Sequence, residues 1–267
     1  MCNKRRKTMS LIRASIVLHL LAVIAVFAEP GQWRWALAAV FTNHVLLTLL
    51  GLWPRSQWLG TNWTQLPAAA RARREIALTI DDGPDPVVTM QALDILDRYA
   101  AKATFFCIGV KAARYPDLCR EIVRRGHAME NHSQHHRYCF ALMGYAGFMR
   151  ELQAAQNTLT RITGQRPLFF RAPAGIRNPL LDLVLTRLGL RLASWSVRGF
   201  DTRIGDVERV STRLLRGLRA GAILLLHDGN AARTIDGNPV ILEVLPTVLA
   251  SAAAANLRFV TLRQALA

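Results

Sequence analysis

Two short clusters contain the residues of this sequence best suited to chemistry. In the first, the carboxylates of Asp81 and Asp82 follow an apolar run and precede a Gly-Pro pair. In the second, His132 and His136 are spaced so that one turn of helix would aim both imidazoles at the same point. One carboxylate and two imidazoles, with coordination positions left open, are the ligands of a hydrolytic zinc-type site. Because the other carboxylate is then free to act as a base, the clusters predict a metal-dependent hydrolase.

Two further clusters have the same position relative to apolar runs. Arg171 ends one run and leads into Ala172-Pro173-Ala174-Gly175, and His227 ends another before Asp228-Gly229. Each cluster also has a structural interpretation, since Asp-Gly pairs form turns and a single Arg or His pairs with any nearby carboxylate. The coincidence of all four clusters at the ends of apolar runs favours a functional site.

The elements that must position these residues follow from the alternation of apolar runs and helical patterns. We predict strands at residues 76–80, 103–108, 128–131, 168–171, 192–197, 222–226 and 258–261. We predict helices at residues 88–99, 116–125, 147–163, 178–188, 207–219 and 240–255. Regular strand-then-helix order predicts parallel strands joined by crossover helices, in an open sheet or a barrel. Sites in both architectures gather at the carboxyl ends of strands, where all four clusters fall.

The order and wording of these motifs resemble the polysaccharide deacetylases, the NodB-homology domain of carbohydrate esterase family 4. The resemblance covers roughly residues 75–265 and implies a deformed (β/α) barrel. It implies that Asp81 is the general base, and that Asp82, His132 and His136 hold one divalent metal ion. That ion is expected to be zinc, with cobalt or nickel as alternatives.

The remaining motifs of the family imply further roles. Arg171 would pair with the base, His227 would be the general acid, and Asp201 would orient and charge His227. The substrate-binding residues are expected to be Ala174, Leu225 and Trp195. The sequence departs from the family in two places, since Ala174 and Thr202 stand where the family commonly has aromatic residues. These positions shape the substrate groove, so the departures bear on the substrate more than on the chemistry.

The N-terminal region reads as a membrane anchor. Residues 1–54 contain a basic tail and two apolar stretches, at about residues 10–28 and 36–53, which are long enough for a transmembrane helical hairpin. A buried helical pair, or a signal peptide cleaved after Ala28, are the alternatives. We expect a juxtamembrane linker at residues 55–74 and the catalytic domain at residues 75–267.

The composition of the chain limits the classes of partner that we expect. The formal net charge is +16, mostly from scattered arginines, and no nucleic-acid-binding motif is present in the sequence, so we expect no nucleic acid partner. An arginine-rich domain behind a membrane anchor favours an amino sugar presented at the membrane, such as a lipid-linked intermediate. Chitin-type oligomers or peptidoglycan are the alternative substrates, and a catalytically silent, membrane-tethered sugar-binding or scaffold protein is the alternative function.

The charges that flank the hairpin and the cysteines of the domain indicate on which side of the membrane the catalytic domain lies. Basic residues flank both outer ends of the hairpin, whereas the connecting loop has Arg34 beside Glu29. The positive-inside rule then places the catalytic domain in the cytoplasm, anchored to the inner membrane, and a periplasmic domain is the alternative. The domain cysteines lack CxxC spacing, and we expect them to be buried thiols in a reducing compartment.

Overall fold

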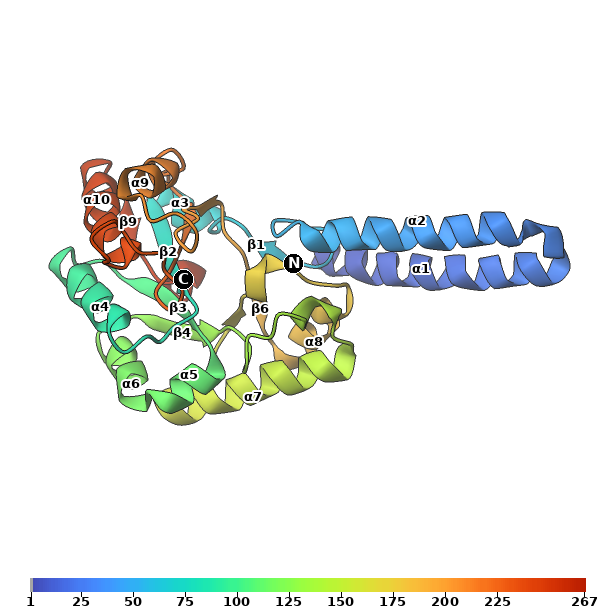
Figure 1. Ribbon diagram of the computed structural model, residues 1–267, viewed down its shortest axis with the longest axis horizontal. Coiled ribbons are helices and arrows are strands. Elements are labelled where there is room, and N and C mark those ends of the chain that lie inside the picture. The colour runs from blue at the N-terminus through green and yellow to red at the C-terminus, as the bar shows by residue number, and fades with distance from the viewer. Residues whose placement is uncertain (1) are drawn as a thin grey trace.

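The computed structural model describes the backbone of residues 2–267 and the side chains of residues 11–267. Met1 and the side chains of the predicted basic tail therefore lie outside the described residues. Two long helices project from one side of an α/β domain (Figure 1). The helices are α1 (Cys2–Ala28), α2 (Trp33–Leu52), α3 (Ala68–Ala72), α4 (Val88–Arg98), α5 (Gly109–Arg114), α6 (Pro116–Arg124), α7 (Tyr145–Thr163), α8 (Leu180–Leu188), α9 (Val207–Leu215) and α10 (Val240–Ala254).

The domain is built on one parallel sheet. Its strands are β1 (Asn62–Trp63), β2 (Glu75–Asp81), β3 (Ala103–Cys107), β4 (Ala128–Asn131), β5 (Phe169–Phe170), β6 (Arg191–Ala193), β7 (Val197–Arg198), β8 (Ile223–His227) and β9 (Arg258–Phe259). Their order among the described residues is β1-β6-β5-β4-β3-β2-β8-β7, with β9 added beside β2. This curled parallel sheet, with crossover helices between its strands, is the predicted deformed barrel.

The register of the sheet brings the chemical residues to one level. Asp81 of β2 is opposite Phe106 of β3 and His227 of β8. Asn131 of β4 is opposite Cys107 and Phe170, so that His132 and Arg171 follow at the same edge. Because every one of these pairs is parallel, strand ends distant in sequence converge at the carboxyl edge of the sheet.

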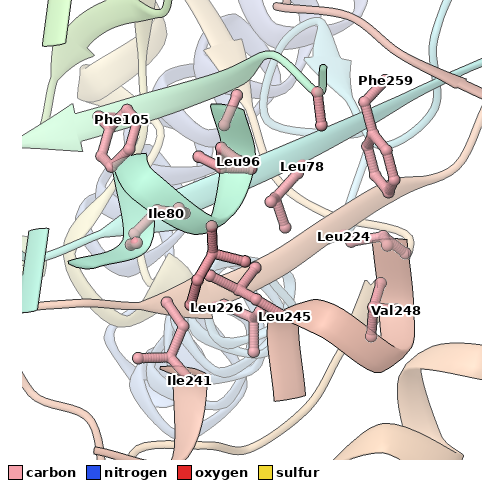
Figure 2. Packing of buried hydrophobic residues seen from close by; sticks show 14 of the residues in the cluster. Leu78, Ile80, Leu96, Phe105, Leu224, Leu226, Ile241, Leu245, Val248 and Phe259 are labelled. Atoms are coloured by element: carbon pink, nitrogen blue, oxygen red, sulfur yellow. The ribbon is translucent and has the colours of Figure 1, made fainter. Parts of the chain in front are cut away.

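The core lies on both faces of the central strands. Alternate residues of β2 and β8, including Leu78, Ile80, Leu224 and Leu226, pack against α4 and α10 (Figure 2). The opposite face of the same strands is also buried, as Ala77 and Ile223 illustrate. Burial on both faces explains why these strands read as continuous apolar runs. The strands are therefore held rigidly where the functional side chains begin.

The structure corrects several predicted elements. The single strand predicted at residues 192–197 is two strands, because β6 pairs with β5 whereas β7 pairs with β8. The helix predicted to reach residue 219 ends at Leu215, and Gly217 then approaches Val197 so closely that a Cβ would lie 2.2 Å from its side chain. The predicted pattern did not include β1, α3 or α5.

The segment expected to be a linker contributes to the domain. Strand β1 pairs with β6, and Leu66 and Ala70 are buried beside residues of the sheet. Residues 55–74 are therefore folded onto the sheet and are not an extended linker. The domain boundary at residue 75 stays a prediction.

The N-terminal hairpin differs from a buried helical pair. Segments Leu11–Ala28 and Pro30–Leu52 are long and apolar enough to cross a membrane, with mean hydropathies of 2.4 and 1.7. Their large side chains are exposed, as for Leu20 (58%) and Phe41 (67%). The alternative of a pair buried within the protein is therefore wrong, whereas a membrane anchor and a signal sequence both remain compatible with these helices.

Polar side chains of the hairpin pair with each other across the two helices. Asn43 Nδ2 donates to Ser15 Oγ over 2.8 Å, and His19 Nε2 lies 3.2 Å from His44 Nε2. In hydrocarbon such groups have no water to bond, so polar residues on paired helices satisfy one another. This explains how Asn43 and His44 can sit inside an otherwise apolar span.

Candidate active site

Three potential metal ligands converge at the carboxyl edge of the sheet. Asp82 Oδ1 lies 3.2 Å from His132 Nε2 and 3.2 Å from His136 Nε2. One ligand atom from each of the three residues falls within 4.8 Å of the other two. We call these three residues the metal-ligand cluster. The sequence predicted this set, and the structure brings it together.

Hydrogen bonds fix the direction of each ligand. His132 Nδ1 lies 2.9 Å from the carbonyl oxygen of Arg171, and since a carbonyl can only accept, Nδ1 carries the proton and Nε2 presents its lone pair to Asp82. Asn230 Nδ2 donates to Asp82 Oδ2 over 2.9 Å, and Oδ1 is buried with no hydrogen-bond donor among the residues that the structure describes.

The donor chemistry fits a divalent ion. A buried carboxylate oxygen facing two imidazole nitrogens is costly unless a cation lies between them. Burial alone would raise the pKa of Asp82, but its closeness to the imidazoles of His132, His227 and His136 holds that pKa well below its usual range. Asp82 is thus ionised, as a metal ligand must be.

Asp81 is held by a buried arginine. Arg171 is 1% exposed, and its Nη1 donates to Asp81 Oδ1 over 2.6 Å and to Thr79 Oγ1 over 2.8 Å. Other donors of the guanidinium reach the carbonyls of Ala193 and Ser194. Asp81 Oδ2 faces the cluster, 3.9 Å from His132 Nε2. One oxygen of Asp81 is therefore fixed while the other points to the metal-ligand cluster.

His227 is held in the same way by Asp201. Its Nδ1 lies 3.0 Å from Asp201 Oδ1, and its backbone N–H donates to Asp201 Oδ2 over 2.7 Å. Burial would lower the pKa of His227, but the hydrogen bond and charge of Asp201 outweigh it, so the pKa is raised. The proton of Nδ1 is engaged by Asp201, which leaves Nε2 as the ring nitrogen available to a substrate.

The local backbone at the site is strained. Asp82, Ser133, His136 and Ala174 all have positive φ, at 73°, 65°, 51° and 54°. Non-glycine residues adopt this conformation at a cost of order 1–3 kcal/mol each and do so most often at functional sites. At His136 the cost is offset locally, because its N–H donates to Ser133 Oγ over 2.9 Å.

The side chains surround a cavity of about 190 Å³. The predicted substrate-binding residues Ala174, Leu225 and Trp195 all line it, together with Asp81, His227 and the metal-ligand cluster. Arg171 and Asp201 lie behind this lining and act through Asp81 and His227. His135, also in the histidine motif, points elsewhere and bonds Glu151 at 2.7 Å.

Sequence reasoning missed two polar residues of the cavity. Asn230 bonds Asp82, and its position shortly after His227 in the same strand exit was the available signal. Arg198 lines the cavity with its guanidinium 5.4 Å from the Trp195 ring and 5.0 Å from the Phe200 ring. No sequence motif distinguished Arg198 from the other scattered arginines.

Comparison with known proteins identifies the family. A family model described as polysaccharide deacetylase matches residues 68–193. A chitooligosaccharide deacetylase from Azorhizobium caulinodans is 40% identical over 157 residues, which are 58% of this chain and 73% of that protein. The chain belongs to the polysaccharide deacetylase family. It is accordingly a hydrolase that acts on carbon–nitrogen bonds other than peptide bonds, in a family of metalloenzymes.

Solved structures agree with this assignment. A peptidoglycan N-acetylglucosamine deacetylase in complex with 4-naphthalen-1-yl-N-oxidanyl-benzamide has a TM-score of 0.68 and 26% identity, covering 76% of this chain and 91% of that one. A CE4 family pseudoenzyme from Bacillus anthracis has a TM-score of 0.66 at 21% identity, covering 73% of this chain and 66% of that one. Since a pseudoenzyme shares the fold, activity must be argued from the residues of the site.

Proposed function

We propose that this protein is a metal-dependent deacetylase that removes the N-acetyl group of an amino sugar, in the class of chitooligosaccharide or peptidoglycan sugars on which its named relatives act. The observation that supports it most is that Asp81 and His227 face one cavity from adjacent strands beside the metal-ligand cluster. Arg171 holds the first of them and Asp201 holds the second. A base and an acid on two sides of one point are what amide hydrolysis requires.

Asp82, His132 and His136 would hold the ion, with open positions left for substrate. We propose zinc, because a mixed oxygen and nitrogen donor set of three protein ligands is typical of catalytic zinc. The bound ion would supply Lewis-acid polarisation of the acetyl carbonyl. Cobalt and nickel suit the same donors and are the alternatives.

The residues of the chain would move the protons. Asp81 Oδ2 would accept a proton from the attacking water, while Arg171 holds Oδ1 and fixes the orientation of the carboxylate. His227 would enter the reaction protonated and donate the Nε2 proton to the departing amine, which otherwise leaves as an unstable anion. Asp201 would favour that charged form and keep the ring aimed at the cavity.

The substrate is proposed to be presented at the membrane. The exposed apolar hairpin would anchor the domain close to the bilayer, and Arg198 places a cation in the wall of the catalytic cavity. A positively charged wall favours an amino sugar that carries an anionic group. Free chitin-type oligomers and peptidoglycan are the alternatives, and we propose that the domain lies on the cytoplasmic side.

Acetate release tests the function directly. The purified full chain, loaded with zinc, is expected to release acetate from N-acetylglucosamine oligomers or from lipid-linked N-acetylglucosamine, and Asp81→Asn is expected not to. Chelation should abolish release and added zinc should restore it. Absence of acetate from this panel, with zinc bound, would favour the silent sugar-binding protein instead.

A further inference from the structure

A second cavity lies between the hairpin and the domain. Its volume is about 470 Å³, and most of its lining is apolar. Helix α1 contributes Ile12 and Ile16, α2 contributes Leu47 and Leu52, and the domain contributes Leu142, Ile176 and Leu180, among others. We call it the hairpin groove. None of the catalytic residues discussed above lines it.

The hairpin groove lies at the level where a membrane would meet the domain. The lining residues that belong to the hairpin come from the start of the first apolar span, Leu11–Ala28, and the end of the second, Pro30–Leu52. Figure 1 shows these helix ends beside the domain and the connecting turn far from it. If the hairpin spans the bilayer, the groove opens where hydrocarbon gives way to lipid head groups.

The groove and the catalytic cavity share one wall. In the segment that follows Arg171, Ala174 and Gly175 line the catalytic cavity, whereas Ile176 and Arg177 line the groove. Three residues of chain extend over about 10 Å at most, so the two cavities are near neighbours.

Close packing fixes this wall against the end of α2. Arg177 N–H donates to the Gly51 carbonyl over 3.2 Å, and a Cβ on Gly51 would lie 2.1 Å from the Arg177 carbonyl oxygen. A Cβ on Gly175 would lie 2.7 Å from Trp195 and 2.8 Å from Pro54. The segment that carries the groove therefore cannot shift without disturbing the catalytic wall.

Arg177 gives the groove a buried charge with unused donors. It is 3% exposed, its Nη2 donates to the Ser56 carbonyl, and its Nε and Nη1 have no hydrogen-bond partner among the described side chains. Burial lowers the pKa of Arg177 to about 10, and the charge of Asp182 acts in the opposite direction. The guanidinium is thus still protonated at neutral pH. Buried guanidinium donors of this kind suit the oxygens of a phosphate.

We propose that the hairpin groove binds the lipid part of a lipid-linked amino sugar phosphate, with the hydrocarbon chain on its apolar lining and the phosphate at Arg177. The sugar would then extend past the shared wall, so that its N-acetyl group enters the catalytic cavity. The inference rests on the proposed deacetylase function, and adds the substrate class and the residues that select it.

Two tryptophan variants on one helix test the hydrocarbon site. Leu47→Trp places a larger side chain in the groove, while Leu46→Trp makes the same change one residue away, at a side chain that is 52% exposed and outside the lining. The measurement is kcat/KM of the zinc-loaded full chain in nanodiscs for prenyl-phosphate-linked N-acetylglucosamine, divided by kcat/KM for N-acetylglucosamine 1-phosphate. The tryptophan would exclude part of the substrate's hydrocarbon chain from the groove. Loss of about two buried methylenes of that chain weakens binding roughly tenfold, so Leu47→Trp should lower the ratio at least about tenfold. Leu46→Trp should leave it unchanged.

Binding of farnesyl phosphate tests the phosphate site without turnover. Native mass spectrometry should show that the wild-type chain retains farnesyl phosphate in preference to farnesol. Arg177→Met should remove this preference, and Arg177→Lys, which keeps the charge, should retain part of it. Equal retention of phosphate and alcohol by the wild type would overturn the assignment of the phosphate to Arg177.

The outcomes separate this inference from the proposed function. If both compounds are deacetylated and Leu47→Trp and Leu46→Trp have equal ratios, the groove is not the lipid site although the deacetylase function stands. A tightly held phospholipid that stays in the groove during wild-type turnover would likewise overturn the inference. If no acetylated sugar is hydrolysed but farnesyl phosphate binding depends on Arg177, the deacetylase function fails and the lipid site remains.

Discussion

At the scale of single residues, two adjacent aspartates of the site have different partners and different proposed roles. Asp81 and Asp82 are neighbours, yet Arg171 holds the first and Asn230 the second. The division arises from the end of β2, where Asp82 adopts positive φ and so turns its carboxylate toward the histidines. The two aspartates therefore differ in their surroundings because different partners hold them.

Substitution of the two aspartates should separate turnover from metal binding. We expect Asp81→Asn to lower kcat by about 10²–10⁴-fold while the bound zinc is retained, since a lost general base costs this much. Asp82→Asn should lose the zinc as well, because the amide is a poor ligand. Metal analysis and acetate release on the same preparations measure both. His135→Gln, at the third histidine of the motif, is the control and should keep its zinc. Full turnover by Asp81→Asn would refute its role as the base.

The pH dependence of kcat/KM should report the His227–Asp201 pair. The pKa of His227 is raised, so the protonated acid persists to higher pH than an ordinary histidine would, and activity should fall as the pH rises through that pKa. Asp201→Asn keeps an acceptor for the His227 N–H but removes the charge, which lowers the pKa of His227. The alkaline limb should therefore move to lower pH in this variant. An unmoved alkaline limb would show that another group is the acid.

At the scale of elements, the local sequence pattern predicted the central strands of the sheet. The central strands β2, β3 and β8 were predicted closely because their burial on both faces makes them mainly apolar. The chemical residues were predicted with the strands, since each lies at or just after the end of one. The architecture and the candidate site thus followed from the same signal.

The missed elements depend on contacts distant in sequence. Strand β1 pairs with β6, and a two-residue strand has no periodicity of its own to detect. The predicted strand at residues 192–197 is interrupted where the carbonyls of Ala193 and Ser194 accept hydrogen bonds from Arg171. Cys139, expected to be buried, is exposed, whereas Cys107 and Cys119 are buried as expected. Arg198 could not be predicted because its position depends on stacking with Trp195 and Phe200.

At the junction between α2 and the domain, replacing a helical glycine by alanine should destabilise the protein instead of stabilising it. Gly→Ala within a helix normally stabilises by about 0.5–1 kcal/mol. At Gly51 the added Cβ would lie 2.1 Å from the Arg177 carbonyl oxygen, so Gly51→Ala should lower the thermal unfolding midpoint. Gly147→Ala in α7 is the matched control, since its nearest neighbours belong to the Met143 side chain and it should cost less. A higher midpoint for Gly51→Ala would mean that α2 and the domain are not docked as described.

At the scale of the whole molecule, the base of the hairpin is joined to the domain that carries the candidate active site. The hairpin exposes apolar side chains along its length, whereas its base is bonded to the domain at Arg177, Ser194 and Asn62. These bonds join the end of α2 to the wall of the catalytic cavity. Under the proposed membrane anchorage, the orientation of the hairpin in the bilayer would therefore fix the orientation of the active site relative to the lipid surface.

Labelling of one exposed thiol should show on which side of the membrane the domain lies. Cys139 is exposed on the domain, while Cys107 and Cys119 are buried. In a Cys2→Ser background, a membrane-impermeant maleimide should label Cys139 after cell lysis but not in intact spheroplasts, because basic residues at both outer ends of the hairpin favour a cytoplasmic domain.

The matching control is Cys139→Ser in the same background, which should remove the labelling seen after lysis. A known periplasmic thiol in the same spheroplasts confirms that the reagent is active. Strong labelling of Cys139 in intact spheroplasts would place the domain in the periplasm and contradict the charge argument. A lipid-linked substrate would then have to be presented on the outer leaflet, because the hairpin groove lies on the same side as the domain.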